Sequence, residues 1–184
     1  MNDSGNYAEY TVPRKAEGKF LKAKLLWLAI YAVIIIAYVC LLLKLSTYGI
    51  LVVIITLPFV PLIFMTLRHL TWNKYVAIDH KYEIANAKIT LTEVHGKREH
   101  EVFSEFVSAF DKIAPVRDEY KADYEGADTV IEFRGSMKSP DSYFLAMTKD
   151  GKKTVIFIEA TNKAVKVMKF YNSKGLVPCD TLRY

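Results

Sequence analysis

A stretch rich in histidine and glutamate holds the side chains best suited by type to metal chemistry. His95 and His100 lie near Glu93, Glu99 and Glu101 across a short turn, and imidazole and carboxylate groups are common zinc ligands. In extended strands, however, residues 99 and 101 share one face while His100 points to the other. These groups do not converge readily, so we interpret them as solvated polar residues of two strands and expect no metal site.

The acidic segment 117–128 is the second group of residues that could bind an ion. It lacks the regular D-x-D-x-D-G ligand spacing of a calcium loop, so a solvated loop is the simpler interpretation. Two tyrosines add aromatic area to the charge, which makes the segment a candidate surface for docking a protein partner. The candidate docking residues are Asp118, Glu119, Tyr120, Asp123 and Tyr124.

No catalytic or nucleotide-binding motif accompanies these residues. The sequence contains no G-x-S-x-G, no H-E-x-x-H, no P-loop and no G-x-G-x-x-G pattern. We therefore expect a protein that is not an enzyme and that has no cofactor. The net charge of +5 does not indicate nucleic-acid binding either, because residues 69–184 carry 18 basic and 17 acidic groups and most of the excess lies beside the apolar runs.

Two long apolar runs are the most distinct structural elements in the sequence. Residues 25–43 and 49–67 are 19 residues long each and contain no Asp, Glu, Lys, Arg or His. As helices they span roughly 28 Å, the thickness of the hydrocarbon core of a bilayer. A cleaved signal peptide would have a shorter apolar region and a cleavage site of small residues. The sequence thus predicts a transmembrane hairpin at 25–67.

Basic residues flank this hairpin on one side and predict its orientation. They precede the first run and follow the second, and by the positive-inside rule both termini are cytoplasmic. Residues 44–48 then form an outer loop, and the aromatic residues Trp27, Trp72 and Tyr48 lie near the two interfaces. We expect anionic lipids of the cell membrane to contact Lys15, Lys19, Lys22, Lys24, Arg68 and Lys74.

Pro58 and Pro61 lie in the middle of the second run. Each lacks a backbone donor, so we expect a kink or local unwinding there. The bend serves either to pack two helices or as part of a gate, and we favour packing because no ionisable group accompanies the prolines. A channel or transporter subunit would require oligomerisation, and the sequence leaves a homo-oligomer open.

The remainder of the chain predicts an irregular N-terminal arm at 1–24 and a β-rich domain at 72–184. Short alternating segments indicate about seven antiparallel strands, with turns at 95–97 and 149–151. The predicted strands cover 75–78, 88–94, 98–103, 129–135, 142–148 and 153–159, and segment 105–115 is ambiguous between helix and strand.

The last element is predicted to be an amphipathic helix over 161–174. Thr161 or Asn162 can cap it, Gly175 can end it, and its apolar face comprises Ala164, Val167, Met168 and Tyr171. Its other side carries Lys163, Lys166 and Lys169, which are either an ordinary solvated face or a docking surface.

The segments YVAIDHKYEIANAKITLTEV, FDKIAPV and DGKKTVIFIEATNKAVKVMKFYN resemble the bacterial pleckstrin-homology (PH)-like fold. With the hairpin, the chain is similar to a family of small two-span membrane proteins of Gram-positive anaerobes whose domain has no known function. The resemblance implies an α+β membrane protein in which a helical hairpin precedes a PH-like barrel or sandwich with a C-terminal helix. A lipid-headgroup pocket of basic residues is not matched, because the turn at 79–81 supplies a single lysine.

Three functions follow as hypotheses. The leading one is a membrane-anchored scaffold or interaction module, in which the hairpin tethers a domain that binds a protein partner. The alternatives are a sensor of anionic lipid headgroups at the cytoplasmic leaflet and an accessory subunit of a small transporter or channel.

Overall fold

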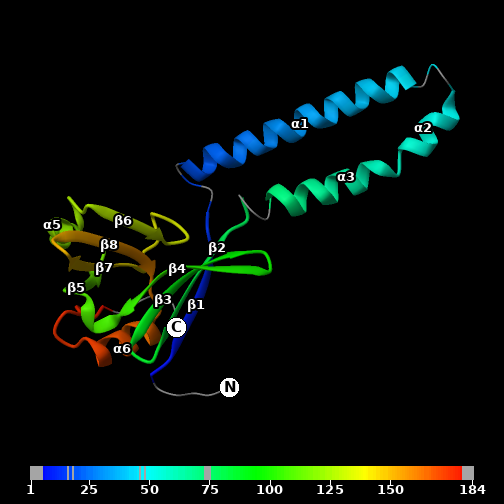
Figure 1. Cartoon of the computed structure of the whole chain (residues 1–184). Coiled ribbons are helices and arrows are strands. Elements are labelled where there is room, and N and C mark those ends of the chain that lie inside the picture. The colour runs from blue at the N-terminus through cyan, green and yellow to red at the C-terminus, as the bar shows by residue number, and fades with distance from the viewer. Residues whose placement is uncertain are drawn as a thin grey trace. The chain divides into compact units, whose positions relative to one another are not determined.

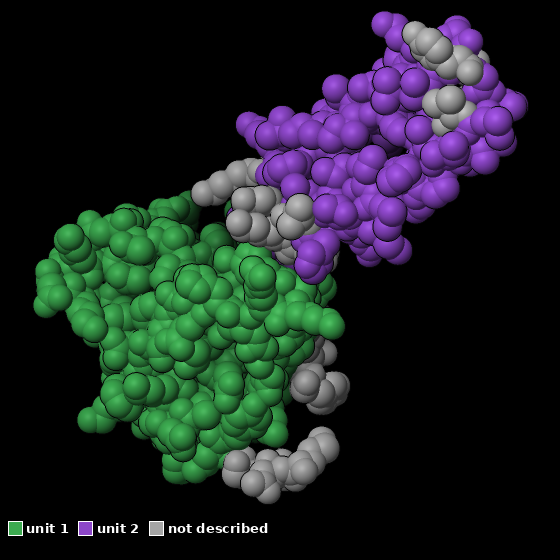
Figure 2. Space-filling model, turned by 45° about the vertical axis from the view of Figure 1, so that its right-hand side comes forward, with its two compact units in different colours: residues 1–15, 79–184 green, residues 16–78 purple. Residues whose placement is uncertain are grey.

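The computed structural model describes residues 6–15, 17, 19–45, 47, 49–72 and 76–179. The chain divides into two compact units, one made of residues 1–15 and 79–184 and the other of residues 16–78 (Figure 2). The unit with the β-sheets is therefore discontinuous in sequence, and the apolar runs lie between its two parts. We refer to these as the sheet unit and the helical unit.

The helical unit begins with α1 (Lys19–Leu45), which is 27 residues long (Figure 1). Within it, Phe20–Leu45 is the one stretch of the described residues that forms a helix long and apolar enough to cross a membrane. The uncharged run at 25–43 thus forms a single helix, as predicted, and it contains no Gly, Pro, Asn, Asp or Ser that would favour a turn.

The second apolar run is not one continuous helix. It forms α2 (Ile50–Thr56) and α3 (Phe59–Leu67), separated at Leu57 and Pro58, and a π-helical turn follows at Arg68–Trp72. The break predicted at Pro58 is confirmed. Pro61 causes no second break, because it lies in the first turn of α3, where backbone N–H groups have no acceptor within the helix.

Two four-stranded sheets make up the sheet unit (Figure 1). The first has the order β1-β2-β3-β4 and is antiparallel throughout. The second has the order β5-β7-β8-β6, in which β6 pairs parallel to β8. The strands are β1 (Ala8–Pro13), β2 (Asp79–Ala85), β3 (Lys88–His95), β4 (Arg98–Phe106), β5 (Lys112–Pro115), β6 (Thr129–Phe133), β7 (Ser142–Lys149) and β8 (Lys152–Glu159).

The N-terminal arm corrects our expectation of irregular structure. Residues 8–13 form β1, which pairs with β2 so that Ala8 lies opposite Ile84 and Pro13 opposite Asp79. Ala8 and Val12 are buried, and Tyr10 packs against the core. The arm is therefore a structural strand of the domain rather than a separate segment.

The start of the β-rich domain also differs from the prediction. No strand lies at 76–78, and Tyr75 falls outside the described residues. Residues 79–81, which we interpreted as a turn, are the first part of β2, and the turn comes at Asn86 and Ala87, both with positive φ. The predicted turns at Gly96 and at Asp150–Gly151 are confirmed.

The C-terminal helix α6 (Asn162–Tyr171) closes the unit. Thr161 caps it by accepting a hydrogen bond from the backbone N–H of Ala164 at 3.2 Å. Its apolar face, including Ala164, Val167 and Met168, joins the main core with Tyr82, Ile89, Leu91, Tyr143, Leu145, Ile156 and Ile158. The helix ends at Tyr171, one turn before the Gly175 stop that we predicted.

Candidate functional site

The histidine and glutamate side chains of β3 and β4 are divided between the two faces of their sheet. His100 lies opposite Glu93 in the register, whereas Glu99 and Glu101 alternate onto the other face, as predicted. His95 contacts Glu93 at 3.2 Å between Nε2 and Oε2. Within the part of the chain that the structure describes, no three of these groups come close enough to hold a metal ion.

The acidic segment has a largely structural role. It forms a 3₁₀ turn at Asp118–Tyr120 and the short helix α5 (Lys121–Tyr124). The Tyr124 ring lies 5.2 Å from the Phe144 ring and 5.7 Å from the Phe157 ring, and Tyr120 also packs against Phe144. The two half-buried tyrosines therefore cover part of the outer face of the second sheet.

The acidic residues of this segment differ in their surroundings. Asp123 forms an ion pair with Lys112 at 2.5 Å, and the same ammonium group lies 4.7 Å from the centre of the Tyr120 ring. Asp118 and Glu119 remain exposed. Only these two of the five predicted docking residues present charge outward without also covering the core.

The outer face of α6 keeps the exposed lysines that were predicted. Lys163, Lys166 and Lys169 are all exposed, and Phe170 beside them is 67% exposed. We did not single out Phe170, although its position at i+4 from Lys166 places it on this face. The result is a surface that combines positive charge with an exposed aromatic ring.

The predicted lipid-contacting residues flank the helical unit. Lys15 follows β1, Lys19, Lys22 and Lys24 lie in the first two turns of α1, and Arg68 opens the π-helical turn. Lys74 and Tyr48 lie outside the described residues.

The end of the sheet unit from which both connections to the helical unit leave carries a distinct set of loops. β1 ends at Pro13 opposite Asp79, the first residue of β2. Asp79 also pairs with Val94, so the turn between β3 and β4 lies at this end. The loop 134–141 between β6 and β7 is joined to it by a hydrogen bond of 2.7 Å from Lys15 N–H to the Gly135 carbonyl. We call these three elements the junction end.

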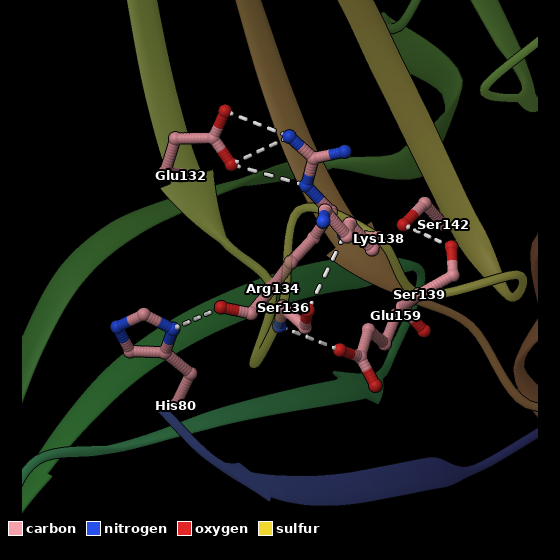
Figure 3. A network of polar contacts seen from close by, with 8 residues as sticks. All are labelled: His80, Glu132, Arg134, Ser136, Lys138, Ser139, Ser142 and Glu159. Atoms are coloured by element: carbon pink, nitrogen blue, oxygen red, sulfur yellow. Dashed lines mark hydrogen bonds and ion pairs between the residues drawn. The ribbon is translucent and has the colours of Figure 1, made fainter. Parts of the chain in front are cut away.

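A network of polar contacts holds loop 134–141 in place (Figure 3). The Glu159 carboxylate is 1% exposed and accepts a hydrogen bond of 3.0 Å from the Ser136 backbone N–H. Arg134 binds Glu132 through Nε and Nη2 at 2.8–3.0 Å, and its guanidinium lies 4.3 Å from the centre of the Phe157 ring. Buried charge is tolerated here because each group has a partner.

His80 is another buried polar residue of this network. Its ring stacks on Phe133 at 4.4 Å, and Nδ1 lies 3.2 Å from the Arg134 carbonyl. Burial lowers the pKa of His80, and the nearby Arg14 lowers it further. The neutral ring therefore donates Nδ1–H to the carbonyl, and Nε2 has no hydrogen-bond partner among the described residues.

Gly135 lets the loop approach β1 closely. A Cβ atom at this position would lie 2.6 Å from Cγ2 of Val12 and 2.8 Å from the Pro13 carbonyl oxygen. The absence of a side chain thus allows the loop to lie directly against the end of β1. Beyond this contact the loop presents Met137, which is 58% exposed, and the exposed Lys138.

Taken together, the polar contacts described for the junction end hold loop 134–141 in place. What the junction end presents outward is basic, with Lys15, Lys97 and Lys138 all exposed. This arrangement can attract anions electrostatically.

Comparison with known proteins gives one match. No curated protein and no solved structure matches the chain significantly. A family profile described as a bacterial PH-like domain (DUF6106) matches residues 2–177, which includes β1, the helical unit and the rest of the sheet unit through α6. The chain therefore belongs to this bacterial PH-like family of unknown function.

Proposed function

We propose that the protein is a membrane-anchored, non-enzymatic interaction module with two spans and both termini in the cytoplasm. The observation that carries this proposal is the insertion of the apolar segment between β1 and β2, which pair with each other. Both covalent connections to the helices leave the sheet unit at Pro13 and Asp79. Such a double connection supports a domain held beside the bilayer rather than one on a long flexible tether.

The polar contacts within the helical unit support a second span despite the break at Pro58. The Tyr38 hydroxyl donates a hydrogen bond of 2.9 Å to the carbonyl of Thr56, the last residue of α2, next to the break. Backbone groups in the hydrocarbon region must be satisfied by the protein itself. Residues 50–67 then extend roughly 27 Å, which is compatible with crossing.

The outer face of α6 is the surface that we propose for a protein partner. It combines Lys163, Lys166 and Lys169 with the exposed ring of Phe170. Exposed aromatic and basic side chains together favour an acidic segment that also carries an apolar anchor. The acidic segment 117–128 is less suited, because its tyrosines cover the second sheet.

This partner is tested by photo-crosslinking in intact cells. A photoreactive residue at Lys166 is expected to capture a reproducible protein neighbour, whereas the same residue at Lys152, which is exposed at the start of β8, is expected to capture none. The added substitutions Lys163→Glu and Lys169→Glu should reduce capture at residue 166 by at least about tenfold, because they reverse two charges at the contact. Equal capture at both positions, or capture of lipid alone, would contradict the proposal.

The same cells provide a control for membrane orientation. In a Cys40→Ala background, Cys179 is the remaining cysteine of the chain. We expect it to stay unlabelled by an impermeant thiol reagent in intact cells and to become labelled after lysis in urea, which also unfolds the sheet unit. Labelling before lysis would place the sheet unit outside.

A second candidate function is contact with anionic lipid headgroups at the cytoplasmic leaflet. The observation that favours it is the set of exposed lysines at the junction end: Lys15, Lys97 and Lys138. Since the chain continues from this end into α1 within a few residues, these ammonium groups would lie within reach of the bilayer surface. Each basic residue near an anionic surface contributes about 1 kcal/mol. The lysines of α1 and Arg68 would add to this charge.

Vesicle binding tests the lipid candidate with matched charge changes. A water-soluble form, made by joining Lys15 to Asp79 through a short loop, is mixed with vesicles of phosphatidylglycerol and phosphatidylcholine. The triple variant Lys15→Gln/Lys97→Gln/Lys138→Gln is expected to bind about a hundredfold more weakly, since about 3 kcal/mol is removed. Lys163→Gln/Lys166→Gln/Lys169→Gln removes the same charge from α6 and should bind nearly as well as the unmodified form. Equal losses would show non-specific attraction.

A further inference from the structure

Two adjoining cavities lie between α1 and α3 in the helical unit. One, of about 80 Å³, is lined by residues that include Ile34, Tyr38 and Ile63, and the other, of about 260 Å³, by residues that include Leu28, Arg68 and Trp72. Both are also lined by Tyr31, Phe64 and Leu67. They therefore form one groove along the two helices, which we call the α1–α3 groove.

Aromatic side chains keep this groove open at its wider end. The Tyr31 ring stacks on the Trp72 ring at 6.1 Å and tilts against the Phe64 ring at 6.2 Å. Its hydroxyl bonds the Thr71 hydroxyl and lies 3.3 Å from the Leu67 carbonyl. Tyr31 thus acts as a spacer between α1 and the π-helical turn.

The two tyrosine hydroxyls of the groove are already engaged within the protein. The Tyr31 hydroxyl is bonded as described, and the Tyr38 hydroxyl at the narrow end donates to the Thr56 carbonyl. The walls between them are provided by aliphatic and aromatic side chains such as Ile34, Ile63 and Phe64. An occupant of this part must therefore be hydrocarbon.

Arg68 gives the wide end a charge that the protein does not neutralise. The chain contains no Asp or Glu between Glu17 and Asp79. Arg68 is exposed, and within the described ranges no carboxylate forms an ion pair with it. A guanidinium at the rim of an apolar groove is complementary to a phosphate with an attached hydrocarbon chain.

We propose that the α1–α3 groove binds one acyl chain of an anionic phospholipid whose phosphate contacts Arg68. From Leu28 to Tyr38 the groove follows ten residues of α1, roughly 15 Å, which equals the hydrocarbon depth of a single leaflet. The wide end with Arg68 and Trp72 corresponds to the headgroup level, where such side chains are favoured. This inference rests on the proposed insertion of both apolar segments in the bilayer.

Photolabelling of the full chain in nanodiscs tests the groove. The probes are phosphatidylglycerol and phosphatidylcholine with a diazirine in the acyl chain. Phosphatidylglycerol is expected to label peptides that contain Ile34, Ile63 and Phe64 more strongly than phosphatidylcholine does. Arg68→Gln should lower phosphatidylglycerol labelling about fivefold, to the level of phosphatidylcholine, because one basic contact is lost. Lys44→Gln removes a charge from the last turn of α1 and should leave labelling unchanged.

A filled groove provides a second variant. Ile63→Trp is expected to remove labelling of the groove peptides by both probes while labelling elsewhere on α1 persists. Equal labelling by the two lipids, or the same result for Arg68→Gln and Lys44→Gln, would overturn the groove proposal. Extraction of the chain by alkaline carbonate would instead overturn membrane insertion, so the two failures are distinguishable.

Discussion

Ala8→Asp is expected to destabilise the sheet unit by about 3 kcal/mol or more, whereas Thr11→Asp should change its stability by less than about 0.5 kcal/mol. Ala8 is 2% exposed and lies opposite Ile84, which is fully buried. A carboxylate there would lose its hydration inside an apolar cluster. Thr11 lies on the other face of β1, is exposed, and faces Lys81 across the strands, so an acid there gains a favourable cross-strand neighbour.

The measurement follows the urea dependence of Cys179 labelling in purified full-length protein with Cys40→Ala. Cys179 reports on the sheet unit because its backbone N–H and carbonyl bond the Tyr143 hydroxyl at 2.9 and 3.0 Å. We expect the midpoint to fall strongly for Ala8→Asp alone. If both substitutions had the same small effect, β1 would not be a strand of the fold.

The sequence signal for β1 exists but is short. Ala8, Tyr10 and Val12 alternate with Glu9 and Thr11, which is the period of a half-buried strand. Six residues give little weight to such a pattern. Sixty-five residues separate the end of β1 from the start of its partner strand β2, so no local turn indicates the pairing. The pairing of β3 with β4 was predictable, because these longer strands alternate clearly and are joined by a local turn of two residues.

The break in the second apolar run was predictable from covalent chemistry, and the groove beside it was not. Proline lacks a donor wherever it occurs, so a break near Pro58 follows from the sequence. The groove depends on the Tyr31 hydroxyl reaching Thr71, 40 residues later. Contacts of this kind depend on how the helices pack, and residue types alone do not predict that packing.

The residues of the candidate site also differ in how far the local sequence predicts their positions. The exposed lysines of α6 follow from helical periodicity, because each position is fixed relative to its own apolar face. The role of Glu159 depends on the Ser136 N–H, 23 residues earlier, in a loop that the parallel pairing of β6 with β8 places there. The packing of Tyr120 and Tyr124 was not predictable, because the sequence did not reveal that the second sheet has an apolar outer face to cover.

Replacement of residues 16–78 by a loop such as Gly-Asn-Gly is expected to give a water-soluble, cooperatively folding sheet unit. Pro13 and Asp79 are directly opposite in the register, so a loop of about five residues, including Arg14 and Lys15, joins β1 to β2 as an ordinary hairpin. Lys15 is retained because its N–H bonds the Gly135 carbonyl. Removing the apolar runs also removes the surfaces that would require a membrane or detergent.

The informative comparison is a fragment that begins at Asp79 and therefore lacks β1. It loses the buried side chains of Ala8 and Val12 and the whole β1 ladder, and it exposes the edge of β2. Burial of one valine contributes about 1.5–3 kcal/mol, so we expect the fragment to be less stable than the joined form by at least about 3 kcal/mol and to aggregate through its open edge. Urea unfolding followed by circular dichroism measures both proteins.

This comparison shows whether the sheet unit needs the helical unit, inserted between β1 and β2, in order to fold. If the joined form folds and the fragment does not, β1 is a required strand, and the helices are an insertion that the domain tolerates without depending on it for folding. Equal stability of the two forms would contradict the register at Pro13 and Asp79. A joined form that is soluble but unfolded would mean that the helical unit contributes to folding, because the strands alone would then not bury enough apolar surface to offset the conformational entropy of the chain.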